Sequence, residues 1–243
     1  PELAGEGMTP ARLGSATHNL GRARAAIEAE VAAVLARAVQ PHPAGFLDLD
    51  PKVLAQVSAE VSLRALARCL MAVGGCDYTP RLERLERLHA HLQDGLSRGV
   101  TLGGCRILPR DAASGEARWL VVREAGRSAA AELAPGVALL WDGRFELRLA
   151  RASGDTAGAV TVGPLGSAGW RSLKAALEEA GEGEKDERIP MAARGALPAI
   201  RDAQGLAAVP PVGYYRDRKA AKQLKLCRFA PTNGLTGPAF TVV

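Results

Sequence analysis

The sequence predicts an α+β fold in which a small helical domain precedes a mixed α/β domain with antiparallel hairpins. Up to about residue 98, apolar residues recur at helical spacing. From residue 99 onward, short alternating runs typical of strands replace that pattern. Asp142-Gly143 separates two of these runs, which is a hairpin signal. We therefore expect a helical domain at 1–98, a mixed domain at 99–215 and a basic tail at 216–243.

The first predicted helix covers residues 17–40. Val31, Val34 and Leu35 lie on one face at helical spacing. Pro41 ends the helix, because proline lacks the amide donor that the next turn requires.

Two further helices follow, each with a recognisable start. Asp50-Pro51 supplies an N-cap and a first-turn proline for a second helix, which Gly74-Gly75 ends. Thr79-Pro80 supplies the same combination of N-cap and first-turn proline for a third helix. Its apolar stripe consists of Leu82, Leu85, Leu88 and Leu92. Three such helices can each bury one face in a small bundle.

The sequence of the second half of the chain predicts mainly strands. Residues 137–141 and 145–149 form the arms of the hairpin around Asp142-Gly143. The other expected elements are strands at 118–123, 160–162, around 200 and at 206–209, a helix at 169–180, and a solvated loop at 181–188.

Composition limits the class of protein. Of the 243 residues, 47% are hydrophobic and 23% are charged, which indicates a globular chain and not a disordered one. No apolar run approaches the roughly 20 residues of a membrane span, and no signal peptide is visible. Four cysteines without a C-x-x-C pair predict reduced thiols in a cytoplasmic protein and no structural zinc. Because Pro1 is not an initiator methionine, we expect a fragment of a longer protein.

Positive charge is concentrated near the C-terminus. The formal net charge is +5, and residues 214–230 alone contain six basic residues against one acid, Asp217. Such a local excess indicates an anionic partner such as nucleic acid.

Several short motifs, taken in order, resemble one known family. They are Gly7-Met8-Thr9, Arg64-Ala65-Leu66, Gly74-Gly75, Tyr78-Thr79-Pro80-Arg81, Leu102-Gly103-Gly104-Cys105, Val122-Arg123-Glu124, Trp141-Asp142-Gly143-Arg144-Phe145 and Arg194-Gly195-Ala196-Leu197-Pro198. This order resembles the region that follows the catalytic domain in tRNA(Ile)-lysidine synthases, and the resemblance spans about residues 7–215.

The resemblance implies a tRNA-modifying ligase. In that family an N-terminal PP-loop domain carries a Ser-Gly-Gly-x-Asp-Ser motif and uses ATP, with Mg, to join lysine to the wobble cytidine of a minor isoleucine tRNA. No such motif occurs in this sequence, so the resemblance assigns no catalytic, cofactor-binding or metal-binding residue here. It implies that this segment binds tRNA, is inactive alone, and works with its own PP-loop domain, as a monomer or a homodimer.

Three groups of basic residues are candidate tRNA contacts. The first is Arg81, Arg84 and Arg87 on the third helix, with His91 continuing the stripe. Regularly spaced cations can neutralise successive phosphates. The alternative is an ordinary solvated face, with Glu83 and Arg87 pairing one turn apart.

The second group is Arg22 and Arg24 on the first helix, which the resemblance places close to the catalytic domain. Arginine suits bidentate phosphate contacts, although a structural salt bridge is equally compatible with the sequence. Arg64 and Arg68, with Glu60 one turn before Arg64, are interpreted as a stabilising set.

The third group follows Tyr214 and Tyr215, whose rings could stack on exposed bases. Its members are Arg216, Arg218, Lys219, Lys222, Lys225 and Arg228. If the segment is helical, Arg218 and the three lysines share one face. The alternative is a basic tail that only aids solubility.

Two other classes of function remain open at this stage. One is a free-standing RNA-binding or protein-adaptor module without ligase activity. The other is an unrelated hydrolase, which lacks support because none of the four histidines has a recognisable serine, cysteine or carboxylate partner. Trp119, Trp141 and Trp170 are expected in the core.

Overall fold

A computed structural model describes residues 9–111, 117–151, 160–181 and 189–236. Its helices are α2 (Pro10–Ala38), α3 (Pro51–Ala55), α4 (Ala59–Gly74), α5 (Leu82–Asp94), α6 (Gly166–Glu179), α7 (Met191–Arg194) and α8 (Arg218–Gln223), with a 3-10 helix η2 (Pro210–Val212). The described chain combines helices with antiparallel sheets, so the predicted α+β class is confirmed. The expected loop at 181–188 lies almost wholly outside the described residues.

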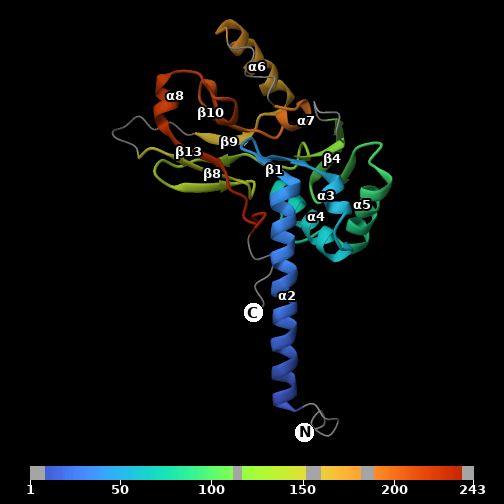
Figure 1. Ribbon diagram of the computed structural model, residues 1–243. Coiled ribbons are helices and arrows are strands. Elements are labelled where there is room, and N and C mark those ends of the chain that lie inside the picture. The colour runs from blue at the N-terminus through green and yellow to red at the C-terminus, as the bar shows by residue number, and fades with distance from the viewer. Residues whose placement is uncertain (1–8, 112–116, 152–159, 182–188, 237–243) are drawn as a thin grey trace.

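The strands form three sheets, and every pairing between them is antiparallel (Figure 1). The first has the order β1-β2-β5-β4-β3, with β1 (Val39–His42), β2 (Phe46–Leu49), β3 (Val100–Leu102), β4 (Cys105–Asp111) and β5 (Ala117–Arg123). The second has the order β12-β11-β10-β9-β6, with β6 (Ala131–Glu132), β9 (Thr161–Pro164), β10 (Pro198–Asp202), β11 (Gly205–Val209) and β12 (Tyr214–Tyr215). The third has the order β13-β8-β7, with β7 (Ala138–Trp141), β8 (Phe145–Leu149) and β13 (Leu224–Phe229).

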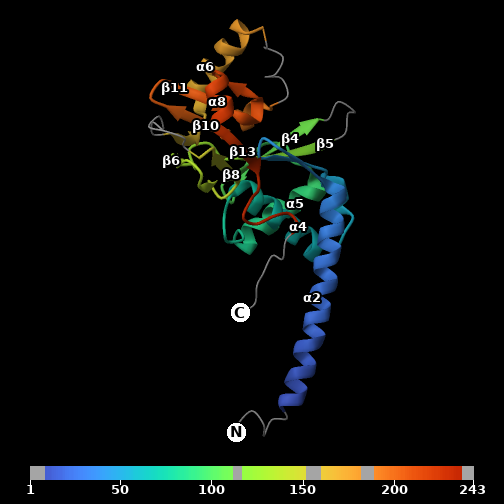
Figure 2. The ribbon, with the colours of Figure 1, turned by 90° about the vertical axis from the view of Figure 1, so that its left-hand side faces the viewer.

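Helix α2 begins earlier than the sequence suggested. The Thr9 hydroxyl accepts a hydrogen bond from the Arg12 amide at 3.3 Å, and Pro10 occupies the first turn. The side chains at 10–23 are exposed, and this half of the helix projects away from the body (Figures 1 and 2). The half that follows packs Val31, Val34 and Leu35 into the core.

The predicted second helix is wrong as a single element. It divides into α3 and α4, because Ser58 adopts an extended conformation (φ −59°, ψ 149°) and starts a new helix. Serine favours this position, since its hydroxyl competes with helical hydrogen bonding. The predicted end at Gly74-Gly75 is confirmed, and Gly75 is left-handed with φ 57°.

The hairpin β1–β2 was not predicted from the sequence. Proline normally interrupts a ladder, but β1 is an edge strand, where a missing amide donor is tolerated. Strand β2 pairs with β5, so one continuous sheet crosses the predicted boundary at residues 98–99. The division into a helical domain at 1–98 and a mixed domain at 99–215 stays a prediction. Part of the predicted basic tail, residues 218–229, forms α8 and β13.

Three apolar clusters form the core. One lies between α2, α4, α5 and the first sheet, and Leu85 and Leu88 contribute to it as expected. The second packs α6 and α7 against both the first and second sheets, and the third lies between the second and third sheets. Trp119 and Trp141 are buried, as predicted, whereas Trp170 is only half-buried and stacks under Arg194 at 4.4 Å.

A buried ionic junction ties the three sheets together. The predicted turn between β7 and β8 is confirmed, and its Asp142 has a left-handed φ of 56°. The Asp142 carboxylate accepts hydrogen bonds from Arg123 of β5 and from Arg144. Arg144, 1% exposed, also reaches the carbonyls of Gly45 at 3.4 Å and Ala196 at 3.3 Å. These contacts fix the third sheet against loops that belong to the other two.

Candidate nucleic-acid interface

The basic segment near the C-terminus folds against the second and third sheets. Asp217 caps α8 by accepting a hydrogen bond from the Ala220 amide at 2.8 Å. Ala220 faces inward, while the rest of this short helix stays largely in solvent. The chain then leaves α8 directly into β13, which pairs with β8. The polar side chains of α8 are therefore displayed on a rigid support.

Arg216, just before α8, is held by a carboxylate. Its Nη1 and Nη2 donate to the two oxygens of Asp202 at 3.0 and 2.6 Å. Its Nε lies 3.6 Å from the Asp217 carboxylate. The hydrogen bonds to Arg216 lower the pKa of Asp202, so the pair is charged at neutral pH. Arg216 is thus committed to a structural pair, which weakens its prediction as a phosphate ligand.

Four basic side chains of this segment remain open to solvent. Arg218, Lys219 and Lys222 belong to α8, and Lys225 belongs to β13. None of them forms an ion pair with another residue in the described ranges. Uncompensated cations on a fixed element are suited to phosphate contacts.

The prediction that these basic residues share one face of a single helix is wrong for part of the group. Helix α8 ends at Gln223, so Lys225 and Arg228 lie on a strand. Arg228 pairs across the sheet with Glu146, with an Nη2–Oε2 distance of 2.6 Å. The helix is short because residues 224–229 satisfy their backbone hydrogen bonds with β8 instead.

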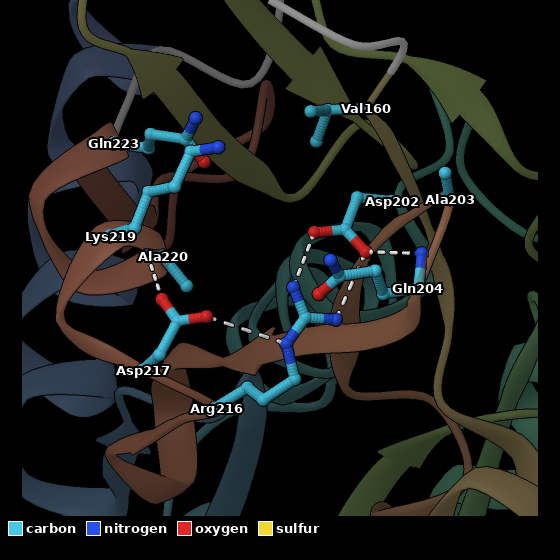
Figure 3. Close-up of a pocket in the computed structure, with 9 residues that line it drawn as sticks. All are labelled: Val160, Asp202, Ala203, Gln204, Arg216, Asp217, Lys219, Ala220 and Gln223. Atoms are coloured by element: carbon cyan, nitrogen blue, oxygen red, sulfur yellow. Dashed lines mark hydrogen bonds and ion pairs between the residues drawn. The ribbon is translucent and has the colours of Figure 1, made fainter. Parts of the chain in front are cut away.

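A cavity of about 280 Å³ opens between α8 and the β10–β11 turn (Figure 3). It is lined by Val160, Asp202, Ala203, Gln204, Arg216, Asp217, Lys219, Ala220 and Gln223. Lys219 and Gln223 lie on the α8 side, while Asp202, Gln204 and Arg216 lie together on the opposite side. Sequence reasoning identified the basic residues here but missed the cavity, since Asp202 and Gln204 are distant in sequence from α8.

The first predicted group lies on α5. Arg84 and Arg87 are exposed beside the buried leucine face, and Arg81 is the N-cap residue of the helix. The Arg87 Nε donates to the main-chain oxygen of Glu83 at 3.3 Å. His91, half-buried, continues the stripe. Arg84, Arg87 and His91 thus lie along α5 with Arg81 at its N-cap, and contact of this group with tRNA stays a prediction.

The second predicted group lies on α2. Arg22 is exposed on the projecting half of the helix, and Arg24 is half-buried. Nearby, the expected pair of Arg64 and Glu60 is confirmed at 2.6 Å. Glu28 of α2 binds Arg64 and Arg68 as well, which anchors the long helix to α4.

The structure does not join the three basic groups into one surface. Helices α8 and α5 lie on different sides of the body in both ribbon views, and α2 extends away from both (Figures 1 and 2). The α8 group contains the most exposed cations without a carboxylate partner in the described chain, so we take it as the candidate interface.

One histidine does have a serine partner, contrary to the sequence-based expectation. His89 Nε2 lies 2.5 Å from the Ser62 hydroxyl where α5 packs on α4. Ser62 is fully buried, and its hydroxyl also donates to the Ala59 carbonyl. A buried serine has no access to substrate, so this pair stabilises the helix contact. No group of three or more possible metal ligands occurs among the described residues.

Comparison with known proteins gives a consistent result. No family model matches the chain. A tRNA(Ile)-lysidine synthase from Caulobacter vibrioides is 34% identical over 125 residues, which is 49% of this chain and 28% of that protein. One from Methylobacterium nodulans is 39% identical over 115 residues, which is 44% of this chain and 34% of that protein.

The chain is similar to a segment of tRNA(Ile)-lysidine synthase. The resemblance predicted from the ordered motifs is thereby confirmed. A third relative of that name, from Rhizobium meliloti, is 28% identical over 60% of this chain and 30% of its own length. The matches thus span about a third of the lysidine synthases that they involve, and no described helix is long and apolar enough to cross a membrane.

Proposed function

We propose that this chain is the tRNA-binding portion of a cytoplasmic tRNA(Ile)-lysidine synthase. The complete enzyme would be a ligase that uses ATP and Mg to join lysine to the wobble cytidine of a minor isoleucine tRNA. The relatives carry that name, and this sequence contains no Ser-Gly-Gly-x-Asp-Ser motif. The segment itself would therefore supply affinity for RNA and no chemistry.

The exposed cations of α8 and β13 are the observation that supports RNA binding most strongly. Arg218, Lys219, Lys222 and Lys225 lie within eight residues of one another in the sequence and have no described carboxylate partner. In this proposal these four side chains contact tRNA phosphates from the surface of the sheet-containing half of the chain. The α5 stripe of Arg81, Arg84 and Arg87 would contact a second, separate part of the same tRNA.

Helix α2 supports a role for the enzyme's own PP-loop domain as a partner. Leu13 and Leu20 are 48% and 72% exposed, and they continue the face on which Ile27 and Val34 pack. An exposed apolar stripe on a projecting helix indicates that another protein surface packs against it. We propose that the PP-loop domain covers it, with Arg22 and Arg24 beside the joint. A homodimer is the other possible occupant.

Binding and activity assays on this chain test the proposal. A transcript of the isoleucine tRNA should bind in 50 mM salt and weaken steeply toward 200 mM, because bound phosphates release counterions. No lysidine should form when ATP, Mg and lysine are added. Lysidine formation by this chain alone would refute the assignment of chemistry to another domain.

The alternative is a free-standing RNA-binding or protein-adaptor module without a ligase partner. It shares the basic α8 surface but predicts no preference among tRNAs. Equal affinity for unrelated tRNAs, with no gain on adding a lysidine synthase PP-loop domain, would favour this alternative.

A further inference from the structure

The guanidinium of Arg216 is a fixed planar surface at the wall of the 280 Å³ cavity. Two hydrogen bonds to Asp202 hold its terminal nitrogens, and Asp217 lies 3.6 Å from Nε. The side chain is 25% exposed, so part of the group remains accessible (Figure 3). A guanidinium plane that cannot rotate is suited to stacking against a nucleobase.

Two amides line the same cavity with no fixed partner, Gln204 on the side of Arg216 and Gln223 across from it on α8. The side chains of Gln204 and Gln223 line the cavity, and neither makes a hydrogen bond to another described residue. Each amide carries both a donor and an acceptor. A glutamine amide can match the edge of adenine by giving one hydrogen bond and accepting another.

The charge of the cavity argues against a small, highly charged anion as its ligand. Arg216 and Lys219 are balanced by Asp202 and Asp217. Of the two cations, Lys219 is the one without a carboxylate partner in the described chain. This arrangement fits one phosphate at Lys219 together with an uncharged polar group in the interior.

Size restricts the ligand further. A volume of 280 Å³ is at the lower end of ligand pockets, which span roughly 300–1,000 Å³. Such a space holds one nucleotide and excludes a base-paired stem.

We propose that this cavity binds a single unpaired adenosine nucleotide of the RNA. The base stacks on Arg216, its edge binds Gln204 and Gln223, and its phosphate binds Lys219. The inference rests on the proposed function only in that RNA is the ligand. It adds a base-reading site to a surface that would otherwise contact phosphates alone.

Short RNA oligomers test this proposal directly. The wild-type chain should bind a hexamer of adenosines at least about tenfold more tightly than a hexamer of uridines, as expected for one amide-read base. The Gln204→Ala, Gln223→Ala double variant should lose that preference and keep the same dependence on salt. Gln204 is exposed and Gln223 is half-buried, and neither side chain bonds to another described residue, so thermal unfolding should change little.

A matched control separates base reading from charge. Lys222 lies on α8 but does not line the cavity. The Lys222→Ala variant should weaken binding of both hexamers equally and reduce the salt slope by about one. A third variant, Arg216→Lys, keeps the charge but removes the plane, and should also reduce the preference.

Failure of this proposal differs from failure of the proposed function. If the chain binds tRNA with a normal salt slope but binds both hexamers equally, the adenosine site is wrong and the tRNA role stands. An adenosine preference that survives in the double glutamine variant would also refute the site. If neither tRNA nor hexamers bind, both proposals are wrong.

Discussion

Arg123 and Asp142 form a buried bidentate ion pair, with Nη2–Oδ1 and Nε–Oδ2 distances of 2.7 and 3.1 Å. Their side chains are 8% and 6% exposed. The same carboxylate accepts hydrogen bonds from Arg144 and Ser128, and the same guanidinium reaches the carbonyl of Gly74 at 2.5 Å. One aspartate thus compensates two buried cations at the meeting point of three sheets.

Removal of Asp142 should strongly destabilise the fold. In Asp142→Ala both guanidiniums lose their carboxylate inside the protein, which costs about 3–5 kcal/mol of unfolding free energy. Urea denaturation measures this change. The matched control is Glu146→Ala, because its partner Arg228 is 64% exposed. Such surface pairs contribute about 0–1 kcal/mol. Equal losses in the two variants would contradict a buried junction.

Gly75 should be intolerant of a side chain. A Cβ there would lie 2.0 Å from the main-chain oxygen of Asp142, and its φ of 57° is left-handed. Gly126 has a similar φ of 79° but no atom within 4 Å of such a Cβ. Gly126→Ala should therefore cost only the roughly 1–2 kcal/mol of left-handed backbone strain. Gly75→Ala should cost clearly more in the same denaturation assay, and an equal cost would argue against the close approach.

The cysteines should differ in reactivity. Burial raises the pKa of Cys69 and of Cys227 to about 12, from the ordinary thiol value of 9.0. Iodoacetamide at pH 8 should therefore label half-buried Cys76 well before these two, as read by peptide mass spectrometry. The folded protein keeps these two thiols protonated to higher pH than the unfolded chain does. Their contribution to the free energy of unfolding is therefore complete below pH 9.0 and is lost as pH rises toward 12. Early labelling of Cys69 would show that the core opens more readily than its burial implies.

Paired and unpaired cations should respond differently to mutation. Lys225→Ala should weaken tRNA binding and reduce the salt slope by about one, since it removes an uncompensated phosphate contact. Arg228→Ala should change binding less, because Arg228 already pairs with Glu146. Filter binding at several salt concentrations compares the two variants. A larger loss for Arg228 would mean that RNA displaces Glu146.

Local signals in the sequence predicted much of the fold. The glycine end of α4 and the Asp142-Gly143 turn each depend on neighbouring residues, and both are confirmed. The leucine stripe of α5 is confirmed for Leu85, Leu88 and Leu92, whereas Leu82 in the first turn is exposed. The β1–β2 hairpin was missed because Pro41 is compatible with a strand only at a sheet edge, and edge position depends on distant pairing.

Long-range relationships were beyond the sequence alone. Gly74, Arg123, Asp142 and Ala196 come from four separate segments, and only the fold reveals that they share one junction. These positions also lie in the motifs that carry the resemblance to lysidine synthases. Much of that motif order therefore reflects structural constraint, and the basic residues of the candidate interface lie mainly outside it.

The salt dependence of tRNA binding tests the central claim most directly, when the wild-type chain is compared with a variant that has alanine at residues 218, 219, 222 and 225. Each phosphate contact contributes about −0.9 to the slope of log affinity against log salt. The wild-type slope should be steep and should become shallower by about three to four in the variant. An identical slope and affinity for the two proteins would contradict the assignment of the α8 surface to tRNA.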